Sequence, residues 1–270
     1  MLYLYGTVYN NRNRVVKCLE SLQKIRAEKR FLIVDNFSTD GTYEILGAID
    51  GVEIIRRKCS RGKGRQLAME LAKDKACADD LFMTFDLDTV YFEEFVKVVE
   101  WGLKNIDKKT VFCGSLCYYE TNFSIPWKDL NNGEDWERYS HFCHEGYNVI
   151  NVKFKSEYAE NEKVLGISRE KRYAKNYGYY ARQWKNNVDL FRGWGINSIH
   201  KLRELFHFMR PKVGRKKFIL LIGLFLVVFL YVTIFKEVYS YGRSMNRIYT
   251  DLNSSFIDSR AIYRSIGTML

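Results

Sequence analysis

A strand-like run that ends in two aspartates constrains this chain more than any other feature. Residues 81–85 (Leu-Phe-Met-Thr-Phe) suit a buried strand, and Asp86 and Asp88 follow directly. Side chains two residues apart in an extended chain point to the same side, so both carboxylates can converge on one cation. A hard divalent ion such as Mg²⁺ or Mn²⁺, bridged onward to phosphate oxygens, is the natural partner for such carboxylates. The simpler alternative is an Asp-rich turn.

Strand-like and helix-like segments alternate along the first 120 residues. Apolar or β-branched runs predict strands at 2–8, 31–34, 52–55, 81–85 and 111–119. Amphipathic stretches predict helices at 14–25, 43–49 and 92–103, and another with the stripe Leu67, Ala68, Leu71 and Ala72 after a basic loop at 56–65. Short connections between alternating elements favour an α/β fold with a mainly parallel sheet covered by helices.

Polar residues gather in the loops that follow these strands. Ligands of parallel α/β sheets bind at the carboxyl ends of the strands, which makes these residues candidates for one site. They are Asn10, Asp35, Arg61, Lys63, Arg65, Asp86 and Asp88. Glycines at 62 and 64, beside a predicted helix start, favour a phosphate-binding loop for the basic cluster, with a solvated charged face as the alternative.

Charge and cysteine content restrict the partners and the compartment. The formal net charge of +11 points to a negative partner such as nucleic acid, anionic lipid or a phosphorylated substrate. No nucleic-acid-binding motif is visible, so no nucleic-acid partner is expected. Six cysteines without a C-x-x-C pair suggest reduced thiols in the cytosol. A strand-like N-terminus, rather than a signal peptide, agrees with that compartment.

Residues 218–235 form an uncharged apolar run of eighteen residues. As a helix this run spans roughly 27 Å, close to the thickness of a bilayer core. A buried core helix is the alternative, but a helix of that length normally shows a polar face. Seven Lys and Arg lie in the twenty residues before the run and three in the twenty after it. The positive-inside rule then predicts a single-pass membrane protein with its N-terminal part in the cytoplasm.

The region after residue 120 departs from the alternating pattern. Residues 131–139 predict a loop that enters a helix with acids in its first turn, and residues 147–154 predict a strand. Residues 169–208 look helical in pieces, and Trp184 and Trp194 suit either a lipid-interface surface or a core. His141, His144 and Glu145 suit surface or core positions better than a metal site.

Four motifs in order resemble those of inverting family 2 glycosyltransferases with the GT-A fold. Residues 33–42 (IVDNFSTDGT) are similar to that family's VD-x-x-S-T-D-G-T signature, and residues 85–91 (FDLDTVY) to its D-x-D segment. Residues 7–10 (TVYN) resemble its opening strand and turn, and residues 133–137 (GEDWE) its later E-D motif. The resemblance covers about residues 2–139. It implies a Rossmann-like nucleotide-sugar-binding domain.

The resemblance also implies a role for each matched residue. Asp35 would contact the base of a nucleotide sugar, with Asn10 nearby, and Asn36 stands where the family often has a second aspartate. Asp86 and Asp88 would hold a Mg²⁺ or Mn²⁺ ion and the diphosphate. Asp135, with Glu134 beside it, would take the proton from an acceptor hydroxyl. Helix N-terminal charge is the plainer interpretation of Glu134 and Asp135.

These interpretations predict a membrane-anchored enzyme of the hexosyltransferase type. It would move a sugar from a nucleotide-diphosphate donor to a lipid-linked or glycan hydroxyl, with inversion. A polyprenyl-phosphate sugar synthase is the alternative enzyme, and a membrane-tethered binding protein is the non-catalytic one. The expected organisation is a donor-binding half at 1–120, an acceptor-binding half at 121–210, a basic segment at 211–217, the span at 218–235 and a tail at 236–270.

Overall fold

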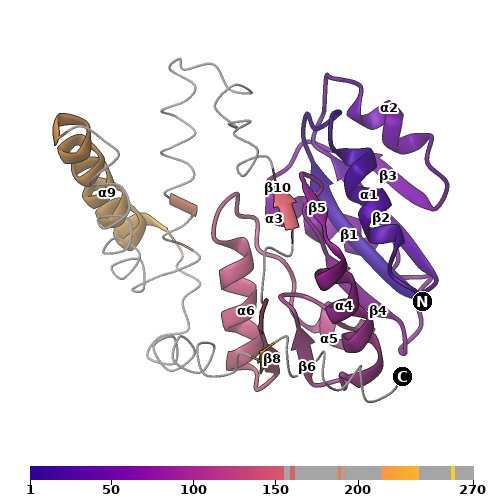
Figure 1. Ribbon diagram of the computed structural model, residues 1–270. Helices are drawn as coiled ribbons and strands as arrows, with labels where there is room; N and C mark the ends of the chain where they lie inside the picture. The colour runs from indigo at the N-terminus through magenta and orange to yellow at the C-terminus, as the bar shows by residue number, and fades with distance from the viewer. Residues whose placement is uncertain (155–158, 162–187, 190–191, 193–214, 237–256, 259–270) are drawn as a thin grey trace.

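A sheet of four parallel strands and one antiparallel strand forms the centre of the protein (Figure 1). The computed structural model describes residues 1–154, 159–161, 188–189, 192, 215–236 and 257–258. The strands, in spatial order, are β3 (Val52–Arg56), β2 (Lys29–Asp35), β1 (Leu2–Val8), β4 (Leu81–Thr84) and the antiparallel β7 (Cys117–Tyr118). The predicted mainly parallel α/β fold is confirmed.

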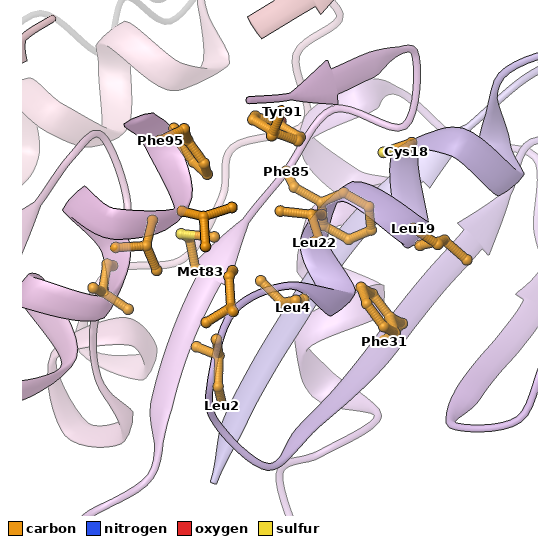
Figure 2. Close-up of a cluster of buried hydrophobic side chains, with 14 of the residues drawn as sticks. Leu2, Leu4, Cys18, Leu19, Leu22, Phe31, Met83, Phe85, Tyr91 and Phe95 are labelled. Carbon is orange, nitrogen blue, oxygen red and sulfur yellow. The ribbon is translucent and has the colours of Figure 1, made fainter. Parts of the chain in front are cut away.

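Helices cover both faces of this sheet, and the central strands β1 and β4 are largely apolar and buried. Leu2 and Leu4 of β1 pack with α1 (Val15–Gln23), α2 (Thr42–Gly47) and α4 (Glu93–Asn105). Figure 2 shows side chains of the sheet, α1 and α4 pointing toward one another in this cluster. The alternate residues Tyr3 and Tyr5 pack on the other face with α3 (Arg61–Glu70). Because successive side chains of β1 point to opposite faces of the sheet, this strand contributes to two separate hydrophobic cores.

The strand order reverses direction between β1 and β4. The chain first adds β2 and β3 on one side of β1 and then places β4 on the other side. In open α/β sheets, the crevice at such a reversal, outside the carboxyl ends of the strands, is the usual ligand site. Asn10 follows β1, and Asp86 and Asp88 follow β4, so three predicted site residues lie at this point.

Helix α3 begins earlier than predicted and takes in the basic residues. Ser60 caps the helix, and its hydroxyl accepts a hydrogen bond of 3.1 Å from the Lys63 N–H. Arg61, Lys63 and Arg65 therefore lie in the first turns of a helix and not in a loop, which corrects the predicted loop at 56–65. A Ser N-cap outweighed the low helix propensity of the two glycines.

The predicted strand at 111–119 is broken into two short strands. β6 (Thr110–Phe112) ends at a turn in which Cys113 has a φ of 46° and Gly114 a φ of 86°, and β7 follows before α5 (Tyr119–Ser124). Positive φ values stop a strand, and the apolar pattern alone does not reveal them. The predicted strand at 147–154 is likewise divided, into β8 (Asn148–Ile150) and β9 (Val152–Lys153). β6 pairs in parallel with β8.

Four further elements, α6, β5, β10 and β11, belong to the described part of the chain. The predicted helix with acidic residues in its first turn is confirmed as α6 (Glu134–His144). β5 (Thr89–Tyr91), directly after Asp88, pairs with β10 (Ala159–Asn161). β11 (Ile257–Asp258) pairs with β9.

Arg138 attaches α6 to the sheet. Its side chain is 1% exposed and donates hydrogen bonds to the Tyr5 hydroxyl (2.7 Å), the Asn122 side chain and backbone oxygens (3.0 and 2.6 Å) and the Ile125 carbonyl (3.1 Å). The Trp127 N–H also reaches the Tyr5 hydroxyl. A fully buried cation with four satisfied donor contacts fixes the position of α6 on β1.

The C-terminal region contains α9 (Arg215–Phe235), which overlaps the predicted membrane span. Among the residues that the structure describes, no helix is both long and apolar enough to cross a membrane. The predicted helical pieces at 169–208, with Trp184 and Trp194, the basic segment before Arg215 and the tail apart from Lys236 and β11 lie outside the described residues.

Local packing predicts opposite effects for two glycine-to-alanine substitutions, at Gly62 in α3 and at Gly47 in α2. A Cβ at Gly62 would lie 2.0 Å from the Lys128 carbonyl oxygen, whereas a Cβ at Gly47 would meet its nearest atom, on Ile54, at 3.9 Å. Gly62→Ala should cost about 1–3 kcal/mol of unfolding free energy. Gly47→Ala should gain about 0.4–1 kcal/mol by restricting the unfolded chain. Urea denaturation of both variants tests this, and unchanged stability of Gly62→Ala would contradict the close packing.

Candidate active site

Two acidic residues at the start of α6 differ sharply in exposure. Gly133 precedes the helix with a φ of 77°, and Glu134 and Asp135 form its first residues. The side chain of Glu134 is 1% exposed and that of Asp135 is 43% exposed. Of the pair, only the Asp135 carboxylate is open to a reacting molecule, while Glu134 is enclosed by its ion-pair partners.

Arg65 joins these two carboxylates to the first aspartate after β4. Its Nη1 donates to Glu134 Oε1 at 3.1 Å and also contacts Asp135 Oδ1, and its Nη2 donates to Asp86 Oδ1 at 3.0 Å. Only 4% of the Arg65 side chain is exposed. The residues predicted to hold a metal and to act as a base are thus brought together by a buried guanidinium.

The environment of Asp135 favours its protonated form. Burial raises the pKa of Asp135 to about 6, the nearby carboxylates of Glu134 and Asp86 act in the same direction, and Arg65 and Arg61 oppose them. Water screens part of this effect because the side chain is partly exposed. A carboxylate with a pKa near neutrality accepts a proton better than an ordinary aspartate does.

The turn that carries Asp86 and Asp88 keeps the alternation of an extended chain. Asp86 is exposed, Leu87 is buried, and Asp88 is half-buried, so the two carboxylates lie on the side away from the core. Gly6 of β1 permits this placement, because a Cβ there would lie 2.7 Å from the Phe85 carbonyl oxygen and 2.8 Å from the Leu87 side chain.

Asn11 is a site residue that the sequence pattern did not single out. It is 4% exposed, and its side-chain amide donates to the Leu87 carbonyl at 2.5 Å while its backbone N–H donates to the Thr42 hydroxyl at 2.9 Å. Asn11 therefore links the turn after β1, the turn of Asp86 and Asp88, and the start of α2. Its place in a turn after a strand gave no signal of these long-range contacts.

Asp86 and Asp88 fit a hard divalent cation by chemistry and placement. Both supply carboxylate oxygens, the ligands that Mg²⁺ and Mn²⁺ prefer, and Asp86 is 60% exposed. Within the described part of the chain, no group of three or more His, Cys, Asp or Glu residues is arranged to hold a metal. A cation at this pair would therefore depend on oxygen ligands from water or a bound phosphate, as Mg²⁺ commonly does.

Asp35 lies at the end of β2, and one of its two carboxylate oxygens is buried without a described donor. The residue is fully buried, and its Oδ2 accepts hydrogen bonds from the Ser38 N–H (3.0 Å) and Arg56 Nε (3.2 Å). No described residue donates a hydrogen bond to Oδ1. Leaving a buried acceptor without a donor is costly, so a ligand N–H that reached Oδ1 would bind favourably.

Asn10 and Asn36 build the loops around Asp35. The Asn36 amide donates to the Cys59 carbonyl (3.1 Å) and its oxygen accepts from the Cys59 N–H (3.2 Å), which ties β2 to the start of α3. Asn10 has a φ of 47°, and its side-chain oxygen accepts from the Thr39 N–H at 2.8 Å. Both residues, which were predicted to bind the donor, thus hold loops together at the carboxyl ends of β1 and β2.

The glycines beside the basic cluster have a packing role. A Cβ at Gly64 would lie 2.8 Å from the Thr7 hydroxyl, and Gly62 donates its N–H to the Leu130 carbonyl at 2.9 Å. Since these contacts explain both glycines, they no longer argue for a phosphate-binding loop. Lys63 is exposed and Arg61, 41% exposed, pairs with Glu134 Oε1 at 3.2 Å.

His141 lies on α6 between two acidic residues of the same helix. Its Nδ1 is 3.8 Å from Glu137 Oε1 and its Nε2 is 3.8 Å from Glu145 Oε1. Burial is the main cause that lowers the pKa of His141. A partly buried imidazole between i±4 carboxylates has an ordinary helix environment, and its placement fits the predicted core or surface role.

Comparisons with known proteins show which family and which structures this chain is similar to. Residues 7–193 match the model of the family described as Glycosyl transferase family 2. The S. aureus TarS 1-349 structure is 12% identical with a TM-score of 0.47, covering 86% of this chain and 91% of that one. The mannosyltransferase PcManGT from Pyrobaculum calidifontis, in complex with GDP-Man and Mn²⁺, is 14% identical with a TM-score of 0.44, covering 74% and 64%. No curated protein sequence matches the chain significantly.

The family match spans more than half of the chain and includes the end of β1, the other strands of the sheet, the Asp86 turn and the start of α6. The protein therefore belongs to glycosyltransferase family 2. Its mostly parallel α/β sheet is the one expected of a GT-A domain.

Proposed function

We propose that this protein is a metal-dependent, inverting glycosyltransferase that transfers a sugar from a nucleotide-diphosphate donor to an acceptor hydroxyl held at a membrane. The observation that carries this proposal is the meeting of Asp135, the exposed acid of α6, with Asp86 through Arg65 at the sheet's switch point. Asp86 is then the donor-side carboxylate, Asp135 is the acceptor-side carboxylate, and both lie within reach of one sugar.

Each residue has a defined task in such a transfer. Asp35 accepts a hydrogen bond from the nucleotide base through its available Oδ1, and the exposed Lys63 adds positive charge near the diphosphate. Asp135 takes the proton of the acceptor hydroxyl as its oxygen bonds to the anomeric carbon, and the bond to the diphosphate breaks on the opposite face. A Mg²⁺ or Mn²⁺ ion at Asp86 and Asp88 would neutralise charge on the departing diphosphate.

The state of Asp135 favours a hydroxyl acceptor over a phosphate acceptor. A sugar or lipid hydroxyl is uncharged near neutral pH and needs a base, whereas a polyprenyl phosphate is already ionised. A partly exposed carboxylate whose pKa is raised to about 6 is suited to the first task. The polyprenyl-phosphate sugar synthase is the alternative that the Asp135 variant below separates from this one.

Asp135→Asn should lower turnover by about 10²–10⁴-fold on the true acceptor, because the base is lost while size and hydrogen bonding are kept. In the wild type, kcat/KM should fall as the pH drops through about 6, where Asp135 gains its proton. Since the folded pKa lies above that of the unfolded chain, ionised Asp135 costs stability above pH 6. Asp135→Asn should therefore not lower the Tm at pH 8. A turnover loss below about threefold would favour a phosphate acceptor.

Asp88→Ala should remove transfer and Asp86→Ala should cripple it, with the fold retained, because each loses a metal-binding carboxylate. A thermal-shift panel of nucleotide sugars with and without Mn²⁺ identifies the donor for the wild type, and the Mn²⁺-dependent shift should disappear in Asp88→Ala. Hydrolysis or transfer of the donor with Mn²⁺ distinguishes the enzyme from a non-catalytic binding protein. Full activity of Asp88→Ala in metal-containing buffer contradicts the metal assignment.

The uncharged run at 218–235 is proposed to anchor the catalytic part, facing the cytoplasm, to a membrane. Its support is the eighteen-residue apolar sequence and the larger basic flank on its N-terminal side. The full chain should stay in washed membranes through carbonate extraction and should leave them when residues 211–270 are deleted. Release of the full chain by carbonate contradicts the anchor, and glycosylation of an acceptor site only upstream of residue 218 reverses the orientation.

A further inference from the structure

We propose that Arg65 is a positioning residue that holds the acceptor-side base and the donor-side carboxylate in one arrangement, and that it is not a ligand of the donor's diphosphate. This inference rests on the proposed function and deepens it. It also replaces the role that the glycine-flanked basic cluster suggested for Arg65, since that cluster lies in a capped helix.

The contacts of Arg65 are directed inward, to protein carboxylates. Nη1 serves Glu134 and Asp135 at the start of α6, and Nη2 serves Asp86 after β4 at 3.0 Å. The side chain is 4% exposed, compared with 41% for its neighbour Arg61. To bind a diphosphate, Arg65 would have to release carboxylates that lose their charge compensation when it leaves. The exposed Lys63 is available without that cost, and Arg61 would give up only Glu134, which Arg65 still contacts.

A tryptophan fixes the guanidinium in place. The Arg65 guanidinium carbon lies 4.8 Å from the ring centroid of Trp127, which is 4% exposed. The Trp127 N–H of the backbone donates to the Gln66 side chain at 2.9 Å, and its indole N–H donates to the Tyr5 hydroxyl at 3.2 Å. Trp127 is thereby held by both α3 and β1. It belongs to the buried core and contacts Arg65 from the core side.

The planar fork of Arg65 explains why arginine is needed at this position. Two terminal nitrogens can serve carboxylates from different elements at once, which a single ammonium group on a flexible stem does with less defined geometry. Without a fixed cation, Asp86, Glu134 and Asp135 would repel one another and separate. A displacement of about 1 Å at a reacting group can cost on the order of 10²-fold in rate.

Arg65→Lys tests this role because it keeps the charge and removes the fork. With donor saturating, kcat should fall by about 10–10²-fold. The Kd of UDP or GDP, measured by calorimetry without divalent metal so that the placement of Asp86 does not enter, should change by less than about threefold, a small effect on this scale. Trp127→Phe is a second variant, which keeps the Arg65 side chain but alters its support. It should lower kcat more mildly, again with the Kd of the nucleoside diphosphate retained.

Arg14→Lys is the matched control for replacing a buried arginine. The Arg14 side chain is 8% exposed and pairs with Glu160 of β10 at 3.6 Å, rather than with any of the three carboxylates that Arg65 joins. Arg14→Lys should lower the Tm as Arg65→Lys does but leave kcat within about twofold of the wild type. That change is much smaller than the loss expected when a reacting group is misplaced.

Two other outcomes overturn the inference in different ways. A weakened Kd for the nucleoside diphosphate with kcat preserved at saturating donor would make Arg65 a diphosphate ligand. A wild-type protein that neither binds a nucleoside diphosphate nor transfers sugar would overturn the proposed function itself, and the positioning role with it. A kcat loss confined to Arg65→Lys and Trp127→Phe supports positioning.

Discussion

Charge balance around one buried arginine is the constraint on which the site depends. Asp86, Glu134 and Asp135 come from two distant parts of the chain, and like charges this close do not stay together unaided. The guanidinium of Arg65 compensates them, and Trp127 holds the guanidinium in position. Helix α3, which also covers one face of the sheet, is therefore the element that joins the two halves of the domain.

Close backbone packing allows α3 to do this. Gly64 lets the helix approach Thr7 of β1, and Gly62 lets it approach the segment at 128–130 that leads into α6. Any larger side chain at these positions would push the helix away from one neighbour or the other. The distance over which Arg65 must reach is thus set by two residues that carry no functional group.

Much of the fold was visible in the sequence because both faces of the sheet are buried. Apolar runs located the four parallel strands, and the polar residues after them predicted a site at the carboxyl-end edge of the sheet. The break at Cys113 and Gly114 was missed, since positive φ values there leave no trace in hydrophobic periodicity. At the site, the motifs predicted roles for Asp35, Asp86 and Asp135, and the structure joins Asp86 and Asp135 through Arg65. The motifs did not reveal that Arg65 turns inward or that Asn11 links three loops, because both depend on contacts between residues far apart in sequence.

The attachment of α6 by Arg138 has a consequence for acid inactivation. The hydrogen bonds from Arg138 go to neutral oxygen atoms of Tyr5, Asn122 and Ile125, which do not change charge in mild acid. The Asp135 carboxylate, by contrast, gains a proton near pH 6, since burial raises its pKa. The contacts that dock α6 are thus independent of the titration of Asp135 in its first turn. With Asp135 as the proposed base, activity would be lost in mild acid and regained on neutralisation while Arg138 still holds α6.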